Sequence, residues 1–206
     1  MGIQIESRCK RCRRLNYKLF LKGEKCFTNK CALEKRKSAS KIPPHRVSQY
    51  SRQLREKQKL RFIYGVTENQ FKRYYERAEK GSDVTGEELL RLLERRLDNV
   101  VWRLSWASSR SQARQLVSHG HFVVNGRKVW TPSSLVKEGD IIEAAEKSKK
   151  MDLIKQNLQL SNRGVLPEWL EVTTESLKAV VRRLPQKEEL EQDIDVTLIV
   201  EYYSRR

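Results

Sequence analysis

The sequence has no long apolar run and few histidines. No stretch of its 206 residues approaches the roughly 20 apolar side chains that a membrane-spanning helix needs. Its three histidines are His45, His119 and His121, and none of them stands in a recognisable nucleophile or phosphate-binding motif. We therefore expect neither a transmembrane segment nor an enzyme.

The N-terminus also lacks the signals that would direct the chain to another compartment. Charged residues begin at Glu6, so there is no apolar signal-peptide core. Gly2 follows Met1, but Glu6 stands where a myristoylation signal requires Ser or Thr. We expect a soluble protein that stays in the compartment in which it is made.

Basic residues dominate the first part of the chain. Residues 1–80 hold 23 Lys and Arg against 7 Asp and Glu, a net charge of +16. Residues 81–206 hold 20 against 19, a net charge of +1. Such an asymmetry usually indicates a polyanionic partner, either nucleic acid or an anionic membrane surface. Since nothing else in the sequence favours a membrane, we predict nucleic acid.

All four cysteines lie in the first 31 residues, as the pairs Cys9-x2-Cys12 and Cys26-x4-Cys31. Two close pairs suit a tetrahedral zinc site, because each pair folds into a tight turn and the intervening segment brings the turns together. Four thiolates leave no open coordination position, so we predict one structural zinc ion. The segment before the second pair suggests a short strand and a turn at Gly23, as in a zinc ribbon.

Three other interpretations of the cysteines stay open. Two disulfides would use the same thiols, but nothing indicates secretion, and reducing compartments disfavour them. An iron–sulfur cluster also takes four thiolates, although this spacing differs from the common ferredoxin patterns. Four unconnected thiols are disfavoured by the clustering of every cysteine. Basic residues around the first pair would offset part of the site's charge and present a basic surface: Lys10, Arg11, Arg13 and Arg14.

A basic helix is predicted after the cysteine region. The segment 32–44 is rich in Lys and Ser, and we expect it to become ordered only on its partner. Ser51 could cap a helix over 53–65. The basic residues of this part that we predict to bind nucleic acid are Arg46, Arg52, Arg55, Lys57, Lys59 and Arg61.

Two further helices are predicted. Thr67 and Gln70 form a capping box for the first of them. Its apolar stripe is more often core than a platform for stacked bases, and Arg73 on its other face is a further candidate for binding nucleic acid. The second runs from Thr85 to Trp106 as one long amphipathic element.

The segment 109–129 combines a capped helix with a hairpin. Ser109 and Gln112 predict the cap, and Asn125-Gly126 is the dipeptide favoured in type I′ turns. The basic side chains of this unit could serve solubility alone, or they could edge one face that binds the shape and phosphates of a structured RNA. On the second interpretation, the RNA-binding residues are Arg110, Arg114, Gln115, His119, Arg127 and Lys128.

The chain resembles bacterial-type small ribosomal subunit protein four. The segment RRLDNVVWRL (95–104), followed by SRSQARQLVSHGHFVVNG (109–126), carries the resemblance to its RNA-binding module. The family's other motifs occur in the same order: the cysteine quartet with KLFLKG (18–23), QLREKQKLRFIYGV (53–66), TGEELL (85–90), LPEWL (166–170) and LIVEYYS (198–204). One departure is the basic loop at 38–51, which is short and lacks the family's Pro-Gly-Gln-His-Gly stretch.

The resemblance implies an α+β protein with a zinc-ribbon-like N-terminus, a helical domain and an inserted α/β RNA-binding module with an antiparallel hairpin sheet. The implied domains are a zinc-binding basic extension (1–45), a helical rRNA-binding domain (46–95) on which 193–206 packs back, and the module (96–192).

The resemblance also implies a structural constituent of the small ribosomal subunit. It would bind small-subunit rRNA at a multi-helix junction, nucleate assembly of the subunit body and touch neighbouring ribosomal proteins. It would lie beside the channel through which mRNA enters and influence decoding accuracy. A bacterial or an organellar ribosome would fit equally.

Rival functions use parts of the same pattern. An RNA-modifying enzyme can carry this module, but the flanking motifs leave no room for a catalytic domain. A zinc-dependent DNA-binding regulator would offer a helix to the major groove within the zinc unit, and the sequence of this unit predicts no clear helix. A free RNA chaperone or ribosome-rescue factor would share the binding physics, and stable retention in mature small subunits would separate it from a ribosomal component.

Overall fold

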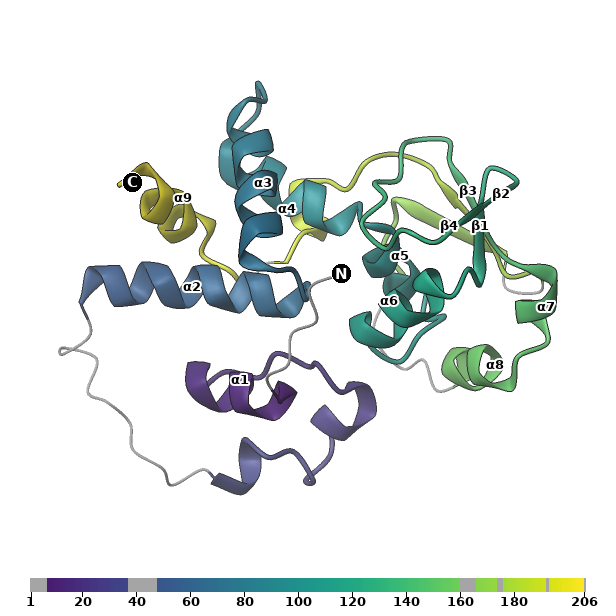
Figure 1. Cartoon of the computed structure of the whole chain (residues 1–206), viewed down its shortest axis with the longest axis horizontal. Helices are drawn as coiled ribbons and strands as arrows, with labels where there is room; N and C mark the ends of the chain where they lie inside the picture. Colours follow the sequence, from purple (N-terminus) through teal and green to yellow (C-terminus); the bar gives the residue numbers. More distant parts are fainter. Residues whose placement is uncertain (1–6, 37–47, 160–165, 174–175, 192, 206) are drawn as a thin grey trace. The chain divides into compact units, whose positions relative to one another are not determined.

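The computed structural model describes residues 7–36, 48–159, 166–173, 176–191 and 193–205. The chain divides into two units, the first comprising 1–90 with 191–206 and the second 91–190 (Figure 1). Among the described residues, no helix combines the length and the apolar character needed to cross a bilayer.

Helices make up the described part of the first unit. Its N-terminal segment holds α1 (Arg8–Leu15) and the 3-10 helices η1 (Gly23–Cys26) and η2 (Glu34–Arg36). The longer helices are α2 (Gln49–Ile63), α3 (Glu68–Glu79), α4 (Thr85–Glu94), within which the boundary between the units falls, and α9 (Val196–Ser204).

The strand predicted before the second cysteine pair does not form. Cys9 and Cys12 lie in α1, and Cys26 ends η1. The intervening residues bury Leu19 in an irregular segment, and Phe20 takes a left-handed backbone conformation with φ 49°. An aromatic residue with positive φ cannot continue an extended strand, so the chain turns at Phe20 instead.

The caps of α2 and α3 show how local the helix signals are. The prediction that Ser51 caps the first helix is wrong, because Ser48 Oγ accepts a hydrogen bond from the Ser51 N–H at 3.3 Å and the helix starts at Gln49. The capping box of α3 is confirmed: Thr67 and Gln70 each accept a hydrogen bond from the other's backbone N–H at 3.4 Å.

The C-terminal helix α9 packs on α2, and both belong to the first unit (Figure 1). Asp195 caps α9 by accepting hydrogen bonds from two backbone N–H groups. Gln53 of α2 donates a hydrogen bond to Glu201 at 2.7 Å. The Tyr203 ring stacks on Tyr75 of α3 with centroids 4.4 Å apart, so the end of the chain closes the helical core.

The predicted single helix over 85–106 is wrong, because the chain forms α4 and a separate α5 (Leu97–Arg103). The break lies at Arg96, whose backbone is extended (φ −64°, ψ 134°) and forms an antiparallel bridge with Leu135. The Arg96 guanidinium is fully buried and donates two hydrogen bonds to Asp98, at 3.0 and 2.7 Å. The buried Arg96–Asp98 ion pair therefore lies at the point where the predicted helix over 85–106 would have continued.

The second unit contains a five-stranded antiparallel sheet in the order β2-β1-β3-β5-β4. The hairpin between the first two strands has the predicted type I′ turn, since Asn125 (φ 49°) and Gly126 (φ 77°) both have positive φ. The α+β class is thereby confirmed. The strands are β1 (Phe122–Val124), β2 (Arg127–Val129), β3 (Ile141–Ala144), β4 (Leu170–Thr173) and β5 (Lys178–Val181).

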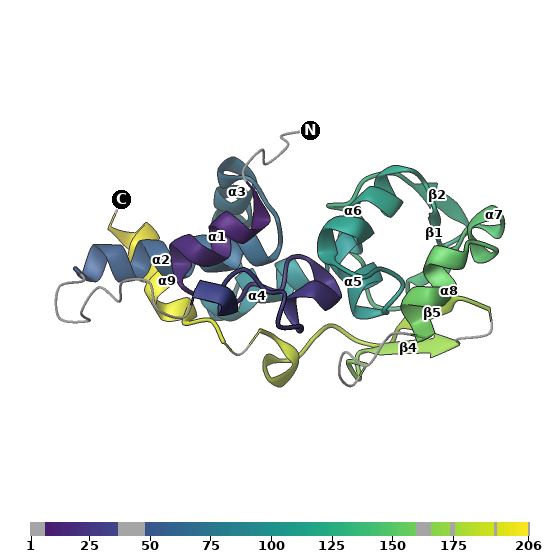
Figure 2. The same cartoon turned by 90° about the horizontal axis from the view of Figure 1, so that it is seen from below.

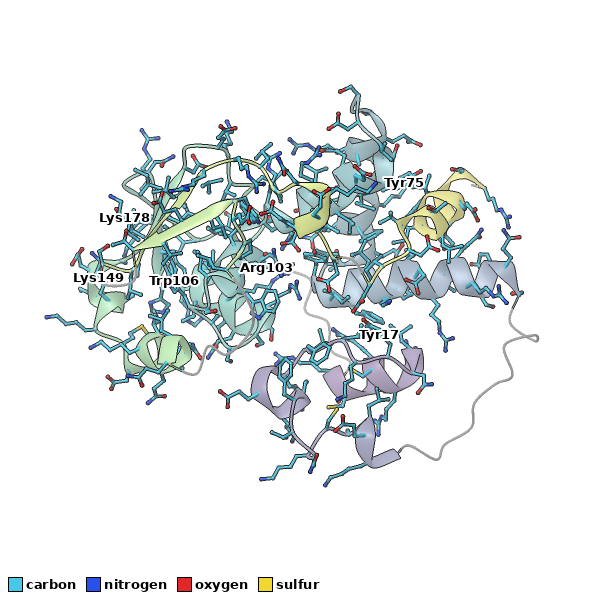
Figure 3. The ribbon with its side chains drawn as sticks, turned by 180° about the vertical axis from the view of Figure 1, so that it is seen from behind. Tyr17, Tyr75, Arg103, Trp106, Lys149 and Lys178 are labelled. Atoms are coloured by element: carbon cyan, nitrogen blue, oxygen red, sulfur yellow. The ribbon has the colours of Figure 1, made fainter. Side chains whose placement is uncertain are left out.

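The second unit also contains α5, α6 (Arg110–Ser118), α7 (Glu146–Lys149), α8 (Asp152–Gln159) and the 3-10 helix η4 (Lys187–Glu189). Figure 2 shows α5 and α6 along one side of the sheet, and their apolar faces share one core with it. Trp106 lies within this core, where its ring stacks on Phe122 with centroids 5.6 Å apart (Figure 3). This packing fixes which face of α6 is exposed.

Candidate nucleic-acid interface

Helix α6 buries one face and exposes the other. Ala113, Leu116 and Val117 are buried in the core of the second unit. The Ser109 hydroxyl accepts a hydrogen bond from the Gln112 N–H at 3.3 Å, which confirms the predicted cap. The opposite side of α6 is exposed or half-exposed, and we call it the α6 surface. It carries four predicted RNA-binding residues: Arg110, Arg114, Gln115 and His119.

Arg110 is held in a defined orientation. Its Nε donates a hydrogen bond to Asn99 Oδ1 at 2.7 Å, and its guanidinium carbon lies 3.8 Å from the centroid of the Trp102 ring. A guanidinium stacked on an aromatic ring keeps its planar fork of donors fixed, and this fork matches the oxygens of a phosphate. The rigid setting lowers the entropy that Arg110 would lose on binding.

A buried carboxylate lies behind Asn99. Glu94 is fully buried, and its carboxylate accepts a hydrogen bond from Asn99 Nδ2 at 2.7 Å. Arg103 donates two more hydrogen bonds to Glu94, at 3.0 and 2.7 Å, and its guanidinium lies 5.1 Å from the Trp102 ring centroid (Figure 3). Glu94 thus positions Asn99, and Asn99 positions Arg110.

Sequence reasoning missed this supporting group of Glu94, Asn99, Trp102 and Arg103. A continuous helix over 85–106 would place Glu94 and Arg103 about 13 Å apart along its axis. They meet because the chain turns at Arg96. The one signal in the sequence was Glu94, an acidic residue inside the otherwise apolar stripe of 85–106. A carboxylate at such a position indicates a buried partner.

Lys128 lies on β2, where it pairs with Val123 of β1. Burial, followed by the charges of His119 and Lys128, lowers the pKa of His121 below its ordinary value. His121 Nδ1 lies 2.9 Å from Ser148 Oγ, within hydrogen-bonding distance. Arg127 and Lys128 are both exposed on β2, so the hairpin adds two cations to the surface of the same unit.

The predicted basic residues of the first unit fall into two groups. Those that stay exposed, or half-exposed in the case of Arg61, are Lys10, Arg13, Arg14, Arg52, Arg55, Arg61 and Arg73. Arg46 and most of the segment 32–44 lie outside the described residues.

Three predicted RNA-binding residues are buried instead, namely Arg11, Lys57 and Lys59. The Arg11 guanidinium lies 5.1 Å from the Phe62 ring centroid. Lys59 donates to the Asp193 carbonyl, and its ammonium lies 4.0 Å from the ring centroid of Tyr17, which Figure 3 labels.

Lys57 is held in the same way. Its ammonium pairs with Glu68 and lies 4.7 Å from the Tyr202 ring centroid. The assignment of Arg11, Lys57 and Lys59 to RNA is therefore corrected, because their charged groups are used inside the unit. Long basic side chains with apolar stems can fill such positions, which their charge alone does not reveal.

The four cysteines are free thiols. Burial raises the pKa of the Cys12 thiol above its ordinary value, and the charges of Cys26, Cys9 and Cys31 raise it further. The Lys22 N–H donates a hydrogen bond to Cys26 Sγ at 3.4 Å. Across the described residues, no three His, Cys, Asp or Glu side chains are arranged closely enough to hold a metal ion.

Comparison with known proteins gives two family matches, one over the N-terminal part of the chain and one over the part that contains α6. Residues 4–94 match the family described as ribosomal protein S4/S9 N-terminal domain, and residues 95–142 match the S4 domain. The chain is 52% identical to small ribosomal subunit protein uS4 of Thermodesulfovibrio yellowstonii over 97% of both chains. It is 51% identical to the proteins of the same name from Geotalea uraniireducens, over 96% of both chains, and from Thermoanaerobacter sp. strain X514, over the full length of both. The chain belongs to the uS4 family of small-subunit ribosomal proteins.

Proposed function

We propose that this protein is a structural constituent of the small ribosomal subunit that binds small-subunit rRNA directly and catalyses no reaction. The observation that carries the proposal is the α6 surface, on which Arg110 is stacked on Trp102 and oriented by Asn99. Its presence within a matched S4 domain supports RNA as the ligand. Likeness to relatives named small ribosomal subunit protein uS4, over nearly the whole chain, supports the ribosome as the place of action.

The RNA is bound through its shape and its phosphates. Side chains cannot enter the deep major groove of an RNA helix, so cations on a fixed surface contact the backbone. Each phosphate contact releases counterions and makes the affinity depend on salt. The proposed RNA-binding set consists of the accessible candidates: Lys10, Arg13, Arg14, Arg52, Arg55, Arg61, Arg73, Arg110, Arg114, Gln115, His119, Arg127 and Lys128.

Finer aspects of the function rest on the resemblance of the ordered motifs. We propose binding at a multi-helix rRNA junction, nucleation of the subunit body and contact with neighbouring ribosomal proteins. Messenger RNA beside the channel through which it enters is a weaker partner, and the contact with a neighbouring ribosomal protein contributes to decoding accuracy. The proposed functional segments are a basic extension (1–45), a helical rRNA-binding domain (46–95, with 193–206) and an RNA-binding module (96–192).

Retention in finished ribosomes tests the structural role against the chaperone alternative. We expect about one copy of the chain per small subunit after washing in high salt, because a constituent is held by many contacts whereas a chaperone cycles off. Quantitative mass spectrometry of washed subunits measures the ratio. A chain found with immature particles and lost from mature subunits would support the chaperone.

We also propose that Cys9, Cys12, Cys26 and Cys31 hold one structural zinc ion. The support is the donor set, since two cysteine pairs at this spacing supply the four thiolates that a structural zinc ion prefers, and the Lys22 N–H donates a hydrogen bond to Cys26 Sγ. Bound zinc would tie the two cysteine pairs together and thereby order the N-terminal basic surface.

Metal analysis of anaerobically purified protein tests the zinc proposal. We expect about one zinc ion per chain and no iron, and we expect the double variant Cys9→Ser/Cys12→Ser to lose the metal, because two ligands cannot close a structural site. Plasma mass spectrometry together with a thiol titration gives both numbers. Fully reduced thiols without metal, or iron with visible absorbance, would contradict the proposal.

A further inference from the structure

One tryptophan of the chain is largely exposed. Trp106 and Trp169 are fully buried, whereas Trp130, which follows β2, keeps 57% of its surface accessible. Tryptophan has the largest side-chain surface to remove from water. An exposed indole on a folded unit is therefore unusual and indicates a contact site for a partner.

The indole of Trp130 is held against the backbone of Gly120. A Cβ placed on Gly120 would lie 2.5 Å from Trp130 Nε1 and 3.0 Å from its Cδ1, so no side chain fits between the ring and this glycine. Gly120 has φ +72°, and its N–H donates a hydrogen bond to the Val117 carbonyl at the end of α6. Gly120 therefore ends α6, and its lack of a side chain lets the Trp130 ring pack against its backbone.

An exposed histidine and an exposed lysine lie close in the chain to the two residues that form this contact. His119, next to Gly120, is exposed at the end of the α6 surface. Lys128 is exposed two residues before Trp130, and its charge together with that of His119 contributes to the lowered pKa of His121. The indole thus stands where the α6 surface meets the hairpin, next to groups that attract a polyanion.

We propose that Trp130 is a stacking platform for an unpaired base of the bound RNA. Bases that project from loops and junctions stack on aromatic side chains, and the flanking cations hold the adjoining phosphates. A protein partner is the alternative occupant, but the exposed positive charge of Lys128 favours RNA. The proposal rests on the proposed rRNA-binding function and adds to it a contact that recognises unpaired nucleotides.

Binding of the full chain to two transcribed RNAs tests the proposal. One is a small-subunit rRNA junction fragment with unpaired nucleotides, and the other is a fully paired duplex of equal length. We expect Trp130→Leu to weaken junction binding about tenfold and Trp130→Phe to weaken it about threefold or less, because Phe keeps an aromatic face. The salt dependence should be unchanged in both variants, because neither removes a charge.

Controls separate stacking from general effects. Leu153→Ala removes a half-exposed apolar side chain of α8 in the same unit and should leave binding unchanged. Duplex binding should be equal in all variants, since a paired base cannot stack on the ring. The difference in fluorescence between the wild-type chain and Trp130→Phe reports on Trp130. Junction RNA should quench this part of the fluorescence and protect it from quenching by acrylamide.

Each outcome decides one proposal. Wild-type affinity of Trp130→Leu for the junction, or an indole still open to acrylamide in the complex, would overturn the stacking platform and leave rRNA binding intact. If the wild-type chain fails to prefer the junction over the duplex, rRNA recognition itself is overturned, and the stacking proposal with it.

Discussion

Replacing Arg110 and Arg114 together by glutamine is expected to weaken binding to small-subunit rRNA about 100-fold near physiological salt. Each charge-assisted hydrogen bond to a phosphate is worth about 1.5 kcal/mol, which corresponds to about tenfold in affinity. Both side chains lie on the α6 surface, four residues apart on one helix. The log–log salt slope should fall by roughly 1.4 to 1.8, because two phosphate contacts are lost.

Two further variants show whether position or charge matters. Lys147→Gln/Lys155→Gln removes the same charge from exposed residues of α7 and α8 in the same unit. It should weaken binding only slightly, since neither lysine lies on the α6 surface. Trp102→Leu keeps every charge but removes the ring beneath Arg110. Trp102→Leu should weaken RNA binding while preserving the salt slope. Equal losses of affinity in all three variants would contradict the assignment of the α6 surface as the RNA-binding site.

Replacing Asp98 by alanine is expected to destabilise the second unit by about 3 to 5 kcal/mol, because it leaves the buried Arg96 guanidinium without its carboxylate. Arg96 is fully buried and donates to Asp98 at 3.0 and 2.7 Å. The change should also loosen the turn at Arg96, which brings Glu94 to Arg103. Urea unfolding followed by tryptophan fluorescence measures the loss, since all four tryptophans belong to the second unit.

Matched variants make this result specific. Glu171→Gln removes one partner of an exposed ion pair in the second unit, whose other partner is Arg182 at 2.9 Å. It should change the stability little, because exposed ion pairs contribute little. The double variant Arg96→Met/Asp98→Leu should recover much of the stability, because an apolar pair needs no compensating charge. Equal losses for Asp98→Ala and Glu171→Gln would show that the buried pair has no special role.

The parts of the fold that sequence predicted correctly are set by short-range chemistry. The capping box of Thr67 and Gln70, the cap at Ser109 and the turn at Asn125-Gly126 each depend on residues within a few positions of one another. Hydrogen bonds from side chain to nearby backbone, and the backbone preferences of Asn and Gly, leave direct marks in the sequence.

The errors arise where distant segments decide the local structure. The apolar stripe over 85–106 continues through Arg96, yet the chain extends there to pair with Leu135 and bury an ion pair. Helical periodicity cannot record that interaction. Likewise, Lys57 and Lys59 have the charge expected of RNA ligands, but partners from elsewhere in the first unit hold them inside.

The candidate site was predicted in the same uneven way. Helical spacing placed Arg110 and Arg114 on one exposed face, because the buried residues of α6 leave only that side open. The support of Arg110 by Glu94 and Asn99 depends on the turn between α4 and α5. The position of Trp130 depends on a contact with Gly120, ten residues earlier, and no local pattern announces it.

A salt titration with two RNAs tests direct recognition of small-subunit rRNA most simply. The full chain is bound to an rRNA junction fragment and, separately, to an unrelated duplex RNA, from low to near-physiological salt. Each phosphate contact should add about 0.7 to 0.9 to the slope of log affinity against log salt. We expect junction binding to remain tight near physiological salt while duplex binding is lost. Equal loss on both RNAs would mean that the net charge of +16 in residues 1–80 acts only as a general polycation.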